Sequence, residues 1–314
     1  MTCYARDGSS SPRDIIDTLP FPGEMFTPTT RHSPYPAIAP CPSDLTGRII
    51  FVSGASSVLG QAAALALARA GAKGLILTSR AAKLDVLDEL EQTILRSRHD
   101  NESKIEILKL PMDILSISSI IWAISRVQKT FGSIDTLLNI SGNIDSLVPL
   151  STSNPTEWWD ALETNVKGTW AITRELLPLI KESKSSTKWI INYTSTSAFY
   201  TSPLCSGYSI SKLALLRLTE MLCTELTIDF GIDILAVHPG TVATPHTASS
   251  VPPSFQHTVI DTPELSAESI VWLVKERRQW LSGRFVSCTW DMNELVQKKE
   301  VVENKDLLRM KFSF

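Results

Sequence analysis

A tyrosine and a lysine stand four residues apart in the segment Tyr208-Ser209-Ile210-Ser211-Lys212. In a helix this spacing places both side chains on one face, one turn apart. A phenol, whose ordinary pKa is about 10, is a poor acid or base at neutral pH, but a cation within a few Å favours the phenolate and lowers that pKa. The pair indicates a proton-transferring Tyr208 assisted by Lys212. Because the pattern is common, an exposed helix face that carries both residues by chance is the alternative.

A serine upstream of this pair could take part in the same site. Ser195 follows the apolar run 189–194 and precedes Tyr208 by 13 residues. Its hydroxyl could hold the oxygen of a carbonyl or alcohol substrate beside the phenol, unless the role falls to a neighbouring hydroxyl: Thr194, Thr196 or Ser197.

A glycine-containing turn, SGASSVLG from Ser53 to Gly60, joins the apolar run 48–52 to the alanine-rich stretch 61–70. Glycine lets the backbone approach a pyrophosphate, and the N-terminus of the following helix offers N–H groups and the positive end of a dipole. We therefore predict a nucleotide-binding turn, rather than an ordinary tight turn. The expected contacts come from Gly54, Ser56, Ser57, Leu59 and Gly60.

The residues that follow the second apolar run, 75–78, determine whether such a site prefers NAD(H) or NADP(H). An acidic residue there would bind a ribose 2′-hydroxyl and repel a 2′-phosphate. This chain has Ser79 and Arg80 instead, and a guanidinium is a donor fork suited to phosphate. We therefore predict NADP(H) as the cofactor; a surface arginine without a ligand is the alternative for Arg80.

Apolar runs alternate with helical patterns along most of the chain. Short runs separated by helices of ten or more residues imply right-handed βαβ units. The predicted fold is an α/β, Rossmann-type, doubly wound parallel β-sheet with helices on both faces, in a single domain. Strands are expected at 48–52, 75–78, 105–110, 134–140, 189–194 and 232–238, and helices at 61–70, 83–98, 117–131, 158–177 (begun by Thr156) and 208–230.

Composition divides the chain into three parts. Residues 1–44 are rich in proline, serine and threonine. Proline blocks helices and sheet ladders, so we expect an extended or partly ordered arm. We favour a passive leader over an arm that wraps the domain or a neighbouring subunit. The catalytic domain is assigned to 45–290 and a C-terminal extension to 291–314. Within the domain, the polar stretch 245–263 is expected to be a mobile substrate loop, and its two histidines are not expected to bind metal.

From residue 45 to about 245 these patterns follow the order of the short-chain dehydrogenase/reductase family, which the chain resembles. The turn is similar to the family's TGxxxGxG, with Ser53 in place of threonine and Val58 in place of the middle glycine. A β-branched residue does not readily adopt φ > 0. Either the loop shifts, weakening or redirecting the cofactor, or Val58 keeps helical angles. The resemblance implies a catalytic tetrad: Asn165, Ser195, Tyr208 and Lys212.

The resemblance implies further cofactor contacts. Asp113, after the third strand, would contact adenine. Asn139 and Gly142 are what remains of the family's NNAG motif, in which Asn139 would brace the sheet. The segment 238–244 is similar to the PGxxxT turn, where the backbone of Val242 and the hydroxyl of Thr244 would fix the nicotinamide amide and the adjacent phosphate.

The resemblance also gives Tyr208 and Lys212 a share in cofactor binding. Asn165 matches the family's NxxG segment in the helical stretch before Ser195, and the resemblance implies that its backbone carbonyl joins Lys212 to solvent through a water. A polar residue at a helix kink is the alternative for Asn165. For His238, at a strand end before proline, we favour a structural role over a catalytic one. The segment 280–286 is similar to the family's last strand, and the C-terminal region resembles fungal members that act in secondary metabolism. Relatives commonly pair through the helices that contain Asn165 and Tyr208, so a homodimer or homotetramer is expected.

Composition argues against several other classes of protein. The net charge is −3, and basic residues are mixed with acidic ones rather than forming a stripe that would bind nucleic acid. Five scattered cysteines without a CxxC pair favour reduced thiols in the cytoplasm over disulfides or a zinc site. No apolar run reaches the roughly 18 residues that a membrane span needs.

These patterns predict an NADP(H)-dependent oxidoreductase that interconverts a ketone and a secondary alcohol, with reduction of a small or natural-product-like carbonyl favoured. The cofactor would carry the hydride and the protein would position it. Two alternatives remain. One is an isomerase or dehydratase that uses Tyr208 and Lys212 without net redox change; the other is a cofactor-binding protein without turnover.

Overall fold

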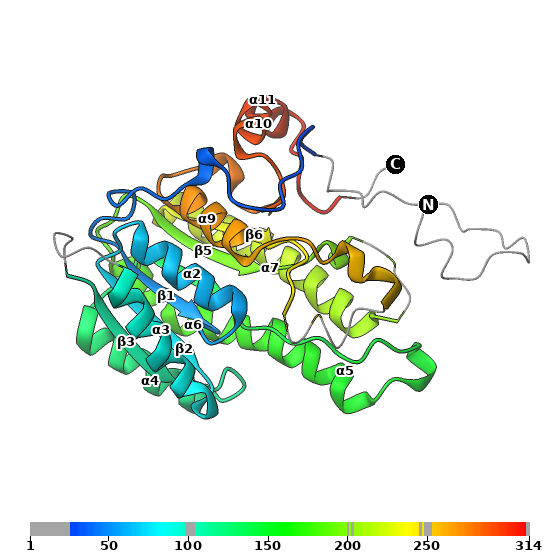
Figure 1. The fold of residues 1–314 in the computed structure, drawn as a ribbon, viewed down its shortest axis with the longest axis horizontal. Helices are drawn as coiled ribbons and strands as arrows, with labels where there is room; N and C mark the ends of the chain where they lie inside the picture. Colours follow the sequence, from blue (N-terminus) through cyan, green and yellow to red (C-terminus); the bar gives the residue numbers. More distant parts are fainter. Residues whose placement is uncertain are drawn as a thin grey trace, which may run out of the picture.

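The computed structural model describes residues 26–97, 104–199, 201, 204–244, 247 and 253–311. Within them, seven strands form one sheet in the order β3-β2-β1-β4-β5-β6-β7, and all neighbouring pairs are parallel (Figure 1). The predicted doubly wound fold is therefore confirmed. The strands are β1 (Ile49–Ser53), β2 (Gly74–Ser79), β3 (Glu106–Pro111), β4 (Thr136–Asn139), β5 (Lys188–Tyr193), β6 (Ile232–His238) and β7 (Arg284–Ser287).

Helices cover both faces of the sheet, which explains why the central strands β1, β2 and β4 are almost entirely buried, whereas the edge strand β3 is partly exposed. In β1, Ile50 and Val52 join the hydrophobic cluster beneath α2, α3 and α9, whereas Phe51 joins the cluster beneath α4 and α6. The α-helices are α2 (Val58–Arg69), α3 (Leu84–Ser97), α4 (Ile117–Phe131), α5 (Pro155–Leu162), α6 (Thr169–Glu182), α7 (Ser206–Phe230), α9 (Pro263–Val274), α10 (Met292–Gln297) and α11 (Lys299–Asn304). Short 3₁₀ turns lie at Pro36–Ile38, Ala81–Lys83, Leu150–Thr152, Thr196–Ala198, Pro253–Thr258 and Gln279–Leu281.

The helix expected over 158–177 differs from the prediction. It begins earlier, because the side chain of Asn154, not Thr156, caps α5 by accepting the N–H of Thr156 at 2.9 Å. It is also interrupted by a π-helical turn, Glu163–Gly168, before continuing as α6. Such turns are frequent at functional sites, and this one contains Asn165.

The two ends of the described chain lie side by side (Figure 1). Thr30 forms an antiparallel bridge with Trp290, and Ile38 is buried in the main core cluster. Residues 1–25 of the predicted arm lie outside the described residues, as do 245, 246 and 248–252 of the predicted substrate loop.

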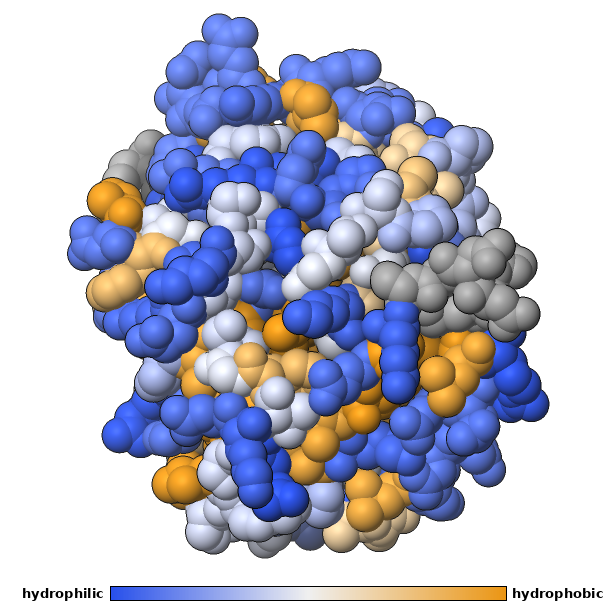
Figure 2. All heavy atoms as spheres, turned by 90° about the vertical axis from the view of Figure 1, so that its left-hand side faces the viewer, coloured by the Kyte–Doolittle hydropathy of each residue, from blue (hydrophilic) through white to orange (hydrophobic). Residues whose placement is uncertain are grey.

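The side of the molecule at the left of Figure 1 presents a mixed surface. Figure 2 shows groups of apolar residues there that are framed and interrupted by polar ones, as is ordinary for a folded protein. Among the described residues, no helix has the length and apolar character needed to cross a bilayer.

Candidate active site

The turn after β1 depends on two glycines. Gly54 has φ +74°, and a Cβ there would lie 2.8 Å from the backbone nitrogen of Ser141. A Cβ at Gly60 would lie 2.3 Å from the carbonyl oxygen of Gly54. A side chain at either position would force the backbone apart, so the glycines allow β1, the turn and α2 to pack closely.

Val58 is the first residue of α2 and lies within the helix. The helix begins there because Ser57 caps it, with Oγ accepting the N–H of Gly60 at 3.1 Å. Of the two alternatives for Val58, the structure therefore shows helical angles. Ser56 is tied to the same turn through its carbonyl, which accepts a hydrogen bond from Gln61, and Leu59 packs against the core.

The residues expected to select the cofactor's phosphate lie at the end of β2. The Ser79 side chain is buried, and its Oγ lies 3.1 Å from the Arg80 carbonyl and 3.3 Å from the Lys83 carbonyl. The Arg80 side chain is exposed. Ser79 therefore shapes the turn, and of the two side chains only that of Arg80 is open to solvent.

Asp113 is exposed at the end of β3, where its Oδ1 accepts the N–H of Leu115 at 3.0 Å. Asn139 is buried at the end of β4, and its Nδ2 donates to Thr173 at 3.1 Å and to Asn192 of β5 at 2.9 Å. Asn139 therefore braces two neighbouring strands.

The residues that replace part of the NNAG motif make a contact of their own. Ser141 Oγ lies 2.6 Å from Ser53 Oγ, so the serine at the start of the glycine turn is bonded to the serine after β4. At Gly142, a Cβ would approach Asn165 Oδ1 to 3.1 Å and Lys212 Nζ to 3.4 Å. The glycine therefore leaves space between the sheet edge and two members of the predicted tetrad.

Asn165 is fully buried in the π-helical turn. Its Oδ1 accepts the N–H of Asn143 at 2.8 Å, and its Nδ2 donates to the Asn143 carbonyl and to Ser211 Oγ, both at 2.8 Å. The amide thus fastens the loop after β4 to the helix that carries Tyr208 and Lys212.

Lys212 is 4% exposed, and its Nζ donates to the carbonyl of Tyr193 at 2.9 Å. The ammonium lies 5.5 Å from the centroid of the Tyr208 ring. Burial lowers the pKa of Lys212 to about 8. The predicted juxtaposition of the two side chains is present in the structure.

Tyr208 differs from the expectation in its electrostatics. Burial raises the pKa of Tyr208 to about 12. A hydrogen bond with Ser195 lowers this pKa and so partly offsets the effect of burial, whereas the charge of Lys212 makes no such contribution. Ser195 is therefore the hydroxyl at the phenol. Thr194 instead donates to the Lys212 carbonyl, and Ser197 bonds Ser195.

His238 is buried at the end of β6, and its Nδ1 has no partner among the described residues. Burial, together with the charge of Lys212, lowers its pKa to about 4, so it is neutral. Val242 is buried, and Thr244 bonds Thr247 through both its N–H and its hydroxyl. Within the described residues no group of three His, Cys, Asp or Glu side chains could hold a metal ion.

Two aspartates that no sequence pattern indicates also touch this region. Asp145 accepts the N–H of Tyr208, and Asp261 accepts the N–H of Thr241. Neither belongs to a motif, and each meets its partner across an interval of sequence. Their burial is the signal, and only the folded structure supplies it.

The fold and the gathering of these side chains at the carboxyl ends of the strands define a Rossmann-type protein. The profile of the family described as short chain dehydrogenase matches residues 48–253. The chain belongs to this family.

Individual relatives support the same assignment. The chain is 38% identical over 293 residues to the short chain dehydrogenase mpl6 of Monascus purpureus, covering 93% of this chain and 98% of that protein. It is 32% identical over 306 residues to the short chain dehydrogenase pigC of Monascus ruber, covering 96% and 99%. Among solved structures, a short chain dehydrogenase from Salmonella enterica superimposes with a TM-score of 0.70 at 25% identity, covering 79% of this chain and 98% of that one.

Proposed function

We propose that this protein is an NADP(H)-dependent oxidoreductase that interconverts a ketone and a secondary alcohol, acting chiefly as a carbonyl reductase. The observation that carries the proposal is the buried pair of Tyr208 and Lys212, with Ser195 bonded to the phenol. A protein that only bound a cofactor would have no use for a buried ammonium beside a phenol.

The residues present fit a nicotinamide dinucleotide. The turn at Gly54 and the capped start of α2 suit a pyrophosphate, and Gly142 leaves room beside Lys212. Asn139 Oδ1 and His238 Nδ1 are buried polar atoms without a partner among the described residues. Arg80 would hold a 2′-phosphate, and Asp113, Val242 and Thr244 would contact the adenine and nicotinamide ends. A solved relative from Escherichia coli, 24% identical, is described as complexed with NADPH.

The chain's own residues would manage the proton. When bound, the reduced nicotinamide supplies a hydride to the carbonyl carbon. Ser195 donates a hydrogen bond to the carbonyl oxygen, and Tyr208, protonated because burial raises its pKa, gives that oxygen its proton. The C=O π electrons become the new O–H bond, and the phenolate left behind faces the ammonium of Lys212.

The proton that restores the Tyr208 phenol would arrive through Lys212 and the π-helical turn. Lys212 already donates to the backbone carbonyl of Tyr193, and the backbone carbonyl of Asn165 would lead the path to solvent through a water.

The proposed substrate is a small carbonyl or alcohol compound, and it is natural-product-like if the chain works in secondary metabolism, as its resemblance to fungal proteins suggests. We further propose a homodimer or homotetramer in the cytoplasm that binds neither nucleic acid nor membrane.

The proposal is tested by mixing the purified full-length chain with NADPH and a panel of ketones, then following reduced-nicotinamide absorbance together with product analysis. Alcohol formed in step with NADPH consumption supports it. Product without any change in nicotinamide redox state would assign the site to an isomerase or dehydratase, and absence of NADPH binding would remove the oxidoreductase function.

A further inference from the structure

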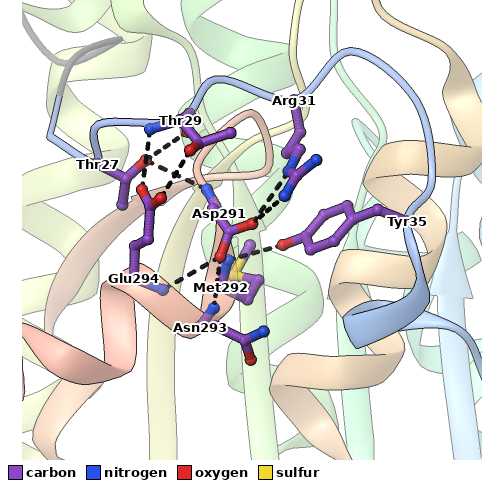
Figure 3. A network of polar contacts seen from close by, with 8 residues as sticks. All are labelled: Thr27, Thr29, Arg31, Tyr35, Asp291, Met292, Asn293 and Glu294. Carbon is purple, nitrogen blue, oxygen red and sulfur yellow. Dashed lines mark hydrogen bonds and ion pairs between the residues drawn. The ribbon is translucent and has the colours of Figure 1, made fainter.

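Residues 26–38, which we call the strap, lie against the C-terminal segment in a network of polar contacts (Figure 3). Thr29 donates to Glu294 through its N–H at 2.9 Å and its hydroxyl at 2.6 Å. Arg31 donates twice to Asp291, at 3.0 and 2.7 Å. The strap is thus held at defined positions rather than resting loosely on the surface.

Apolar contacts fix both ends of the strap. The ring of Phe26 lies 4.9 Å from that of Trp290, and Ile38 is 1% exposed in the main core. Between these anchors Tyr35 accepts the N–H of Met292 at 2.7 Å. The intervening residues of the strap are therefore held in fixed positions, so they can position a side chain that contacts them.

That side chain is Asp261, which is 8% exposed. Its Oδ1 lies 2.6 Å from Nδ1 of His32, and the N–H of Thr262 donates to the His32 carbonyl at 2.9 Å. His32 thus binds the segment before α9 through both its ring and its backbone.

The other oxygen of Asp261 faces the turn after β6. Oδ2 accepts the N–H of Thr241 at 2.6 Å, and Val242 forms a parallel bridge with Asp261. Gly240, at φ +94°, is packed so closely that a Cβ there would lie 2.7 Å from Oδ2. One carboxylate therefore touches the strap on one side and the predicted nicotinamide-binding turn on the other.

His32 and Asp261 both lie outside the residues that the family profile matches, 48–253, whereas the turn at 240–242 lies within them. If His32 were removed, one oxygen of a largely buried carboxylate would lose its partner, which is costly unless the carboxylate moves. A carboxylate that rotates toward solvent would release the N–H of Thr241.

We propose that the strap is a positioning part of the cofactor site, in which His32 acts through Asp261 to fix the turn at 240–242. The inference rests on the proposed function only in its final step, that this turn holds the nicotinamide. His32 and Asp261 are positioning residues and have no chemical role in the reaction.

The first test measures the turn directly, by hydrogen–deuterium exchange of peptides that contain Thr241 in the full-length protein. His32→Ala should exchange several-fold faster there than the parent, and His32→Asn, whose amide can replace the Nδ1 donor, should restore protection. Ser33→Ala, an exposed neighbour on the strap, is the matched control. Protection in His32→Ala equal to that of the parent would overturn the proposal.

The second test measures the dissociation constant of NADPH by fluorescence, with kcat at saturating NADPH beside it. His32→Ala should weaken NADPH binding by roughly three- to tenfold, since its bond to a carboxylate is charge-assisted but half exposed, and should change kcat little. Faster exchange with unchanged NADPH affinity would overturn the positioning role. A parent protein that does not bind NADPH would instead overturn the proposed function, and the exchange measurement would still decide whether the strap fixes the turn.

Discussion

The backbone N–H of Tyr208 donates a 2.9 Å hydrogen bond to Oδ1 of Asp145, a buried carboxylate in the loop after β4. The second oxygen packs against Gly207, where a Cβ would come within 2.7 Å of it. A carboxylate at the N-terminus of α7 complements both the free N–H groups and the helix dipole. Asp145 thereby fixes the turn of helix that carries the proposed acid relative to the edge of the sheet.

Removing this carboxylate should impair turnover more than cofactor binding. We expect Asp145→Ala to lower kcat by about tenfold or more, because small displacements of a catalytic group are costly, with the KM for NADPH within about threefold of the parent. Asp145→Asn keeps an acceptor and should recover most of kcat.

Ser116→Ala is the control, because Ser116 caps α4 in the same manner. It should cost about 1 kcal/mol of stability without lowering kcat. Equal kcat values for Asp145→Ala and the parent would show that the contact does not position Tyr208.

Arg80 should decide between the two nicotinamide cofactors. Arg80→Ala is expected to raise the KM for NADPH by roughly 10- to 100-fold, the worth of a charge-assisted hydrogen bond, while leaving the KM for NADH nearly unchanged. Arg96→Ala, an exposed arginine on α3, is the matched control. A parallel change in both KM values would remove Arg80 from phosphate recognition.

Val58 should have little effect on cofactor affinity, although it replaces a glycine of the family motif. Because Val58 lies within α2, restoring glycine relieves no strain. We expect Val58→Gly to leave the NADPH dissociation constant within about twofold of the parent, as measured by fluorescence titration. A tenfold gain in affinity would mean that the valine side chain obstructs the phosphates.

His238 should make the protein sensitive to mild acid. Burial holds its folded pKa near 4, below the ordinary value of 6.5, so the unfolded chain binds the proton more readily between these limits. Stability is therefore fully present above about pH 6.5 and is lost as the pH falls toward 4, by at most about 3 kcal/mol. In urea unfolding, His238→Asn should lose less stability than the parent over this range, and the exposed His257→Asn should match the parent.

Local patterns predicted the alternating strands and helices because the apolar periods of buried strands and amphipathic helices are properties of short segments. The 117–131 helix and the 232–238 strand have the bounds expected. The π-helical turn around Asn165 was not predicted, since its hydrogen bonds to Asn143 and Ser211 link distant segments. The contacts of Asp145 and Asp261 could not be predicted either, because they also join residues that are far apart in the sequence.

Only the structure shows which effect dominates the pKa of Tyr208. Spacing alone suggested that Lys212 would lower the phenol's pKa, yet the ammonium donates to the Tyr193 carbonyl and lies 5.5 Å from the ring centroid. Burial is the larger effect and raises the pKa. A one-dimensional pattern brings two groups together but does not show how much solvent either one loses.

The central claim, that hydride passes to a carbonyl carbon while Tyr208 supplies the proton, is tested most directly by isotope transfer. Full-length protein is given NADPH carrying deuterium at the transferable position of nicotinamide C4, together with a ketone that it consumes, and the product is analysed by mass spectrometry. We predict an alcohol one mass unit heavier with deuterium on the carbinol carbon, and no such product from Tyr208→Phe, which should still bind NADPH. A product without deuterium, or undiminished transfer by Tyr208→Phe, would contradict the account.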